Sequence, residues 1–103
     1  MSNRFLRIAI AIALVGASVA AGAADQWSGR DIAANCANCH GTDGRSRGAM
    51  PSLAGRDKAD IALYVREFRD GKRPSTVMQQ LAKGYTDAQI EAAAAYLAAQ
   101  KPN

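Results

Sequence analysis

Apolar side chains return at helical spacing in the middle of the chain. They occupy positions i, i+3, i+4 and i+7, the spacing of one helix face: Ile61, Tyr64, Val65 and Phe68. Charged residues fill the other side, and Gly71 followed by Pro74 marks the end of the pattern. The pattern therefore predicts an amphipathic helix from about Asp57 to Asp70.

The C-terminal segment has the same periodicity with smaller side chains. Thr86 is a suitable helix N-cap, and Gln89, three residues later, completes a capping box. The apolar stripe that follows consists of Ile90, Ala93, Ala94 and Leu97. Alanine is dense in this stretch, which favours a helix through its high propensity and also permits close approach of another helix. We predict a last helix that begins after Thr86 and ends before Pro102.

Two further helical segments are predicted, and no segment has the alternation of a strand. Residues Ser28 to Asn38 indicate a first helix with Ser28 as its cap, and Ser75 to Lys83 indicates a short one. Residues 41–55 are rich in turn formers and should be irregular. With no internal repeat and no second domain, the expected fold is all-α, a small single domain with three main helices.

The first two dozen residues have the composition of a secretory signal peptide. Arg4 and Arg7 precede an apolar stretch from Ile8 to Ala20. Ala21-Gly22-Ala23 fits a small-residue cleavage site, as does Gly22-Ala23-Ala24 one residue later, so cleavage would fall before Ala24 or Asp25. The alternative is an uncleaved anchor, but this stretch is short for a membrane-spanning helix, which needs about 20 apolar residues. We predict a cleaved signal peptide over residues 1–24, a mature domain over residues 25–103, and no membrane span after cleavage.

The clearest chemistry lies in Cys36-Ala37-Asn38-Cys39-His40. On a helix, residues three and four apart share a face, so both thiols and the imidazole can act together. The thiols can add to the two vinyl groups at one edge of a haem while the imidazole reaches the iron from one side. This spacing is the attachment motif of c-type haem. A haem would also supply apolar surface to a mature domain so small that its core alone is marginal, and the apoprotein should fold poorly.

Other uses of these residues are less consistent with the sequence. A thioredoxin-like Cys-x-x-Cys belongs beside a βαβ pattern, which is missing here. A structural zinc site needs four ligands, whereas the chain has 2 cysteines and 1 histidine. A structural disulfide would leave His40 unexplained. One covalent haem c, held through Cys36 and Cys39 with His40 on the iron, is therefore the expected cofactor.

The second axial ligand decides what such a haem can do. His40 is the only histidine, so ligation by two histidines of one chain is excluded. Methionine is the obvious partner and raises the reduction potential. Met78 is favoured over Met50, because the 38 residues from His40 to Met78 can lead the chain round to the far face of the ring. Met50, or an open or exchangeable position, remains as an alternative.

The charge balance excludes one class of partner. The chain has 13 basic and 9 acidic side chains, and two of the basic ones, Arg4 and Arg7, leave with the signal peptide. This excess is too mild for nucleic-acid binding. The basic residues do cluster, at Arg66, Arg69, Lys72, Arg73 and Lys83. The cluster is either a solvated helix face or a docking patch that steers a negatively charged redox partner.

The haem motif and overall pattern resemble the class I c-type cytochromes. Ser75-Thr76-Val77-Met78 and Ala82-Lys83-Gly84-Tyr85-Thr86 are similar to the distal-ligand segment of the cytochrome c553/c4 group, and especially of the haem subunit of flavocytochrome c sulfide dehydrogenase. Residues 48–55, Gly-Ala-Met-Pro-Ser-Leu-Ala-Gly, are similar to the proximal loop of that group. The resemblance covers nearly all of the mature chain.

The resemblance implies specific roles. Met78 would be the axial ligand, and the carbonyl of Pro51 would accept a hydrogen bond from the imidazole of His40. The first and last helices would cross. Gln79 and Gln80 stand where that group often has glycine and arginine. This difference should change the protein surface near the haem edge and have little effect on ligation of the iron. The sulfide dehydrogenase subunit often carries two haem domains in tandem, whereas this chain has one haem motif.

These observations together predict a function in electron transfer without bond chemistry, because no nucleophile is paired with a base. Haem attachment in bacteria occurs outside the cytoplasm, so the expected location is the periplasm. The expected partners are redox proteins, among them a flavin-containing sulfide dehydrogenase subunit. A free electron shuttle to a respiratory partner is the main alternative, and an open-site ligand-binding or peroxidase-like haem protein is a further one.

Overall fold

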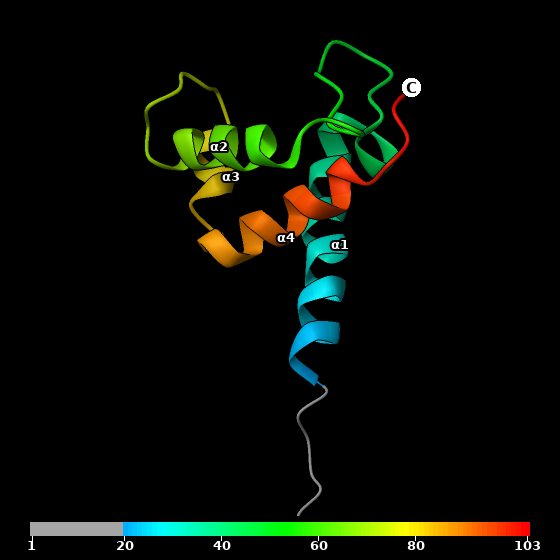
Figure 1. Ribbon diagram of the computed structural model, residues 1–103. Helices are drawn as coiled ribbons and strands as arrows, with labels where there is room; N and C mark the ends of the chain where they lie inside the picture. The colour runs from blue at the N-terminus through cyan, green and yellow to red at the C-terminus, as the bar shows by residue number, and fades with distance from the viewer. Residues whose placement is uncertain (1–19) are drawn as a thin grey trace, which may run out of the picture.

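The computed structural model describes the backbone of residues 20–103 and the side chains from residue 29 onward. It contains four α-helices and no strand within the described part (Figure 1). The helices are α1 (Ala20–His40), α2 (Lys58–Arg69), α3 (Met78–Ala82) and α4 (Asp87–Ala98), and a 3₁₀ turn, η1 (Thr42–Gly44), follows α1. The all-α fold with three main helices is confirmed. No helix among the described residues has the length and apolarity that crossing a membrane requires.

Helix α1 begins earlier than predicted. The sequence placed a cap at Ser28, but the helix already starts at Ala20, so the predicted cap is wrong. The upstream residues are rich in alanine, the best helix former, and continue the helix past Ser28. Most of the predicted signal peptide, residues 1–19, lies outside the described residues. The predicted cleavage point, before Ala24 or Asp25, falls within α1.

The chain turns sharply after the haem motif. Gly41 has a φ of 85°, and a Cβ there would collide with the carbonyl oxygen of Arg45. Only glycine fits such a position without strain, because its lack of a Cβ opens this region of backbone conformation. His40 is therefore the last residue of α1, two residues beyond the predicted end at Asn38.

Helix α2 matches its predicted span closely. Asp57 caps it, with its Oδ1 accepting hydrogen bonds from the backbone N–H groups of Ala59 at 2.8 Å and Asp60 at 3.2 Å. Ile61 belongs to the hydrophobic core and Val65 packs against it, and the whole apolar stripe lines a cavity. The short helix predicted within residues 75–83 is present as α3.

Helix α4 confirms both its predicted cap and its predicted face. Gln89 N–H donates to Thr86 Oγ1 at 3.2 Å, and Thr86 N–H donates to Gln89 Oε1 at 2.9 Å, which completes the capping box. All four stripe residues are buried. The core that they help to form is small and consists of Ala33, Ile61, Ala62, Ile90, Ala94 and Leu97.

Helices α1 and α4 cross in close contact (Figure 1). A Cβ built on Gly29 would lie 2.5 Å from the carbonyl oxygen of Ala92, so the two backbones nearly touch there. Glycine on one helix and alanine on the other make this approach possible. The crossing expected from the resemblance is therefore present, and it positions the end of α1 against the rest of the fold.

Replacing Thr86 with alanine should lower the free energy of unfolding by about 1 kcal/mol, because loss of an N-cap costs about 0.5–2 kcal/mol. Urea unfolding of the haem-loaded protein measures this. Thr42→Ala is a matched control, because Thr42 is exposed and its side chain makes no hydrogen bond to a described residue. Equal losses in the two variants would contradict the capping argument.

Candidate functional site

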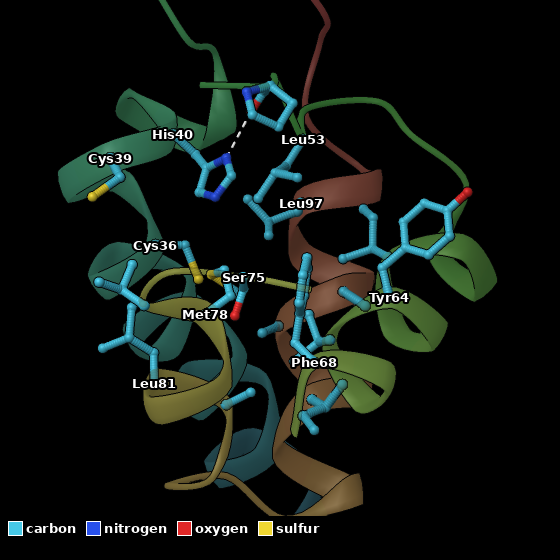
Figure 2. A pocket seen from close by; sticks show the side chains of 18 of the residues that line it. Cys36, Cys39, His40, Leu53, Tyr64, Phe68, Ser75, Met78, Leu81 and Leu97 are labelled. Atoms are coloured by element: carbon cyan, nitrogen blue, oxygen red, sulfur yellow. Dashed lines mark hydrogen bonds between the residues drawn. The ribbon is translucent and has the colours of Figure 1, made fainter. Parts of the chain in front are cut away.

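The last turn of α1 brings the three motif residues together at one wall of a cavity (Figure 2). Cys36 is half-buried and its thiol contacts the carbonyl oxygen of Ile32 at 3.6 Å. Cys39 is exposed, and neither cysteine forms a disulfide. The structure thus leaves both thiols available on the side of the cavity that His40 also occupies.

His40 is buried and held in one orientation. Its Nδ1 lies 2.7 Å from the carbonyl oxygen of Pro51. A carbonyl can only accept, so Nδ1 donates the hydrogen bond and carries the proton. In the neutral ring this tautomer leaves the lone pair on Nε2, the nitrogen through which the imidazole could then bind a metal. The hydrogen bond that the resemblance implied for Pro51 is present in the structure.

The loop that carries Pro51 is itself fixed by backbone contacts. Leu53 N–H donates to the carbonyl of Gly44 at 2.7 Å, and Gly55 N–H donates to the carbonyl of Leu97 in α4 at 3.0 Å. The side chain of Asn103 reaches back to the carbonyl of Ser46 at 2.9 Å. Because the loop is tied to η1, α4 and the C-terminal residues, the carbonyl of Pro51 cannot easily leave His40.

The cavity has a volume of about 470 Å³, within the range of about 300–1,000 Å³ usual for cofactor and ligand sites. Its walls come from α1, α2, α3, α4 and the loops between them, and most lining side chains are apolar. All four residues of the α2 stripe, Ile61, Tyr64, Val65 and Phe68, line it. A large apolar chamber with thiols and an imidazole on one wall suits a flat apolar macrocycle that is attached through sulfur.

The two candidate methionines occupy different parts of the cavity wall. Met50 precedes Pro51 in the loop that supports His40, and it is 40% exposed. Met78 begins α3 and is half-buried. Figure 2 shows His40 and Met78 on opposite sides of the cavity, with Cys36 between them. This arrangement suits His40 and Met78 as ligands on the two faces of one ring, so the residues present fit haem c.

The competing uses of the cysteines receive no support. Burial raises the pKa of the Cys36 thiol, whereas a reactive thioredoxin-like cysteine has a lowered pKa. Among the described residues, no three His, Cys, Asp or Glu side chains gather in a way that could hold a metal ion. A redox dithiol and a zinc site are therefore disfavoured.

The predicted basic cluster is largely paired with acidic groups. Arg66 binds Glu91 at 2.8 Å, and Arg69 binds Asp87 at 2.7 Å, so both arginines of α2 link to α4. Arg66 and Lys58 together lower the pKa of the Glu91 carboxyl. Three of the five side chains of the cluster, Arg66, Arg69 and Arg73, therefore form ion pairs, and two of these pairs join α2 to α4.

Two cavity residues were missed from the sequence, and so was one hydrogen bond outside the cavity. Arg56 and Arg73 line the cavity, and the Tyr96 hydroxyl donates to Asp43 Oδ1 at 2.8 Å, which ties α4 to η1. This bond raises the pKa of the Tyr96 hydroxyl. Asp43 has a φ of 52°, rare for a residue other than glycine. Asp43, an acidic residue among turn formers, was the one signal in the sequence for this hydrogen bond. Nothing in the pattern indicated Tyr96 as its partner.

The fold and the cavity together define a class of protein, the c-type cytochromes, which are electron carriers. Comparison with known families agrees. Residues 24–97 match the family described as cytochrome c oxidase, cbb3-type, subunit III, and the chain belongs to this family. Membership implies a covalently bound haem c.

Relatives of known name narrow the resemblance. The chain is 43% identical over 68 residues to the cytochrome subunit of sulfide dehydrogenase of Chlorobaculum tepidum, which covers 66% of this chain and 62% of that protein. It is 36% identical to the thiosulfate dehydrogenase electron acceptor of Thiomonas intermedia, over 95% of this chain and 46% of that protein. It is 32% identical to cytochrome c-554(548) of Halomonas halodenitrificans, over 77% of this chain and the whole of that protein. The chain thus spans only part of the first two relatives.

Proposed function

We propose that this chain is an exported, periplasmic mono-haem cytochrome that transfers single electrons through a haem c ligated by His40 and Met78. Cys36 and Cys39 attach the haem, and residues 1–24 are removed as a signal peptide. The observation that carries the proposal is the cavity, with the thiols and an oriented imidazole on one wall and a thioether across from them.

Each residue has a definite task in this proposal. Haem c supplies reversible one-electron exchange when bound. Pro51 holds the His40 imidazole with Nε2 turned away from the loop, and so fixes both the tautomer and the ring orientation. The thioether of Met78 is a weak, neutral donor that favours the reduced state. The apolar walls contributed by α2 exclude water and disfavour additional charge on the iron.

We propose a flavin-containing sulfide dehydrogenase subunit as the partner that delivers the electrons. The likeness to the cytochrome subunit of sulfide dehydrogenase supports this, as does the similarity of residues 75–86 to the distal segment of such subunits. A free electron shuttle is the second candidate, and one observation favours it. The chain covers the whole of a relative named as a cytochrome, which shows that a domain of this size can be an entire protein.

Purification of the native protein from the periplasmic fraction under mild conditions tests the proposal. Mass spectrometry should find a chain that begins at Ala24 or Asp25 and carries the mass of one haem, and the oxidised spectrum should show a methionine-to-iron charge-transfer band. Flavin absorption with a second, larger chain would identify an enzyme subunit, with sulfide as the first substrate to try. A lone haem-bearing chain would identify a free carrier. Retention in the cytoplasm without covalent haem would contradict the proposal.

A further inference from the structure

Two arginines stand out among the residues that line the cavity. Arg56 and Arg73 are the only lining side chains with a permanent charge in the described part of the chain. The other lining groups are apolar or neutral apart from the titratable thiols, imidazole and phenols. A guanidinium at the edge of a cavity can form charge-assisted hydrogen bonds to an anionic group of the molecule that the cavity holds. Thiol attachment and axial ligation give neither arginine a role.

Arg73 is held in a defined position. Its guanidinium carbon lies 4.2 Å from the centre of the Tyr64 ring and 5.8 Å from that of Phe68, a cation–π arrangement. Glu67 fixes it from outside, with Oε2 at 2.8 Å from Nη2 and 3.0 Å from Nε. The aromatic rings and the carboxylate together keep this cation at the rim of the cavity, and 39% of its side chain remains exposed.

The rim at Arg73 lies away from the cysteines. Figure 2 shows Tyr64 and Phe68 on the side of the cavity across from Cys36 and Cys39. Since Arg73 stacks on Tyr64, it belongs to that far side. Arg56 follows Gly55 in the loop before α2, and its exposed side chain makes no ion pair or hydrogen bond with a described residue. One cation is thus positioned on the far side, and a second lines the same cavity without a described partner.

The chemistry of haem supplies a matching anion. Its two vinyl groups, which take up the thiols, lie toward one edge of the ring, and its two propionates lie toward the opposite edge. We propose that Arg73 and Arg56 form a two-point binding site for these propionate carboxylates, in which Glu67 positions Arg73 and offsets part of its charge. This inference rests on the proposed haem-binding function.

The site has an electrostatic consequence of definite sign. A fixed positive charge near the haem favours the state with one more electron, so Arg73 and Arg56 raise the reduction potential. Glu67 opposes this effect, because its carboxylate lies against the same guanidinium. Removal of the cation and removal of its counter-ion should therefore shift the potential in opposite directions.

Potentiometric titration of the haem-loaded protein tests the proposal with variants that remove one charge each. Arg73→Gln and Arg56→Gln should lower the reduction equilibrium constant about three- to tenfold, and Glu67→Gln should raise it, where tenfold corresponds to about 59 mV for one electron. Arg69→Gln is the matched control, because Arg69 lies on α2 outside the cavity and pairs with Asp70 and Asp87. It should leave the potential almost unchanged. If the reduction potential shifted in the same direction in Arg73→Gln and Glu67→Gln, or did not shift, the propionate site would be refuted. Arg73 would then have only a packing role.

Two additions keep the result interpretable if a variant folds poorly. Arg73→Lys keeps the positive charge but lacks the planar guanidinium. Its reduction potential should therefore stay close to that of the native protein. Resonance Raman spectra should show the propionate bending mode shifted in Arg73→Gln and unshifted in Arg69→Gln. A normal methionine charge-transfer band with an unshifted propionate mode would refute the carboxylate site alone. A wild-type protein without covalent haem would refute the site and the proposed function together.

Discussion

Replacing Met78 with alanine is expected to lower the reduction potential by on the order of 0.1 V, because axial ligands tune haem potentials over about 0.8 V. The thioether favours the reduced state, and its loss removes that preference. The charge-transfer band of the oxidised protein should disappear, and the reduced protein should bind carbon monoxide, which the native protein should not. Spectroscopy and potentiometry on one preparation measure all three effects.

Met50→Ala is the matched control for this prediction. Met50 also lines the cavity, but it lies in the loop on the His40 side and is more exposed than Met78. It should keep the charge-transfer band and reject carbon monoxide. If Met50→Ala lost the band and Met78→Ala kept it, the assignment of the two methionines would be reversed. Carbon monoxide binding by the native protein would revive the open-site alternative.

Replacing Gly29 with valine should lower the free energy of unfolding by about 3 kcal/mol, near the upper end of the range for overpacked cores. The added Cβ would lie 2.5 Å from the carbonyl oxygen of Ala92 and 2.8 Å from its carbonyl carbon. These are backbone atoms, so no side chain can turn aside and the two helices must separate. Since α1 carries all three motif residues, the haem environment should change as well. Urea unfolding, followed by haem absorption and by circular dichroism, measures both effects.

Gly48→Val tests whether the loss comes from the crossing rather than from the substitution itself. A Cβ at Gly48 meets nothing within 4 Å, so this variant should unfold almost like the native protein. Equal destabilisation at both positions would mean that the α1–α4 contact is not as close as the structure shows. A Gly29→Val variant with nearly native stability would also show that the two helices are further apart at this crossing.

Local signals in the sequence predicted the helices well where apolar periodicity and caps coincide. The capping box at Thr86 and the α4 stripe are both confirmed, and α1 ends at His40, two residues after the predicted Asn38. The start of α1 was predicted wrongly because a good cap residue, Ser28, can lie inside a helix when strong helix formers precede it. A cap signal shows where a helix can begin and gives no evidence that it does begin there.

The cavity was predicted in its chemistry but not in its extent. The motif named Cys36, Cys39 and His40. The α2 stripe suggested a core helix, although all four of its residues line the cavity and only Ile61 is also a member of the buried core. The sequence named Arg73 as a member of the basic cluster but could not place it at the cavity. Its stacking on Tyr64 depends on the chain reversal at Gly71, where φ is 73°. Contacts across a turn leave no periodic trace in a sequence.

The ion pairs between α2 and α4 also reduce the electrostatic field that an approaching protein experiences. A paired Arg66 or Arg69 presents a local dipole, and the field of a dipole falls with distance faster than that of a lone charge. Beyond a Debye length of about 8 Å at physiological ionic strength, little of it remains. Lys72 and Lys83, which form no ion pair with a described residue, are then the members of the cluster that an acidic partner would sense first. Diffusional encounter on this face should consequently depend on ionic strength as if about two charges were present, rather than five.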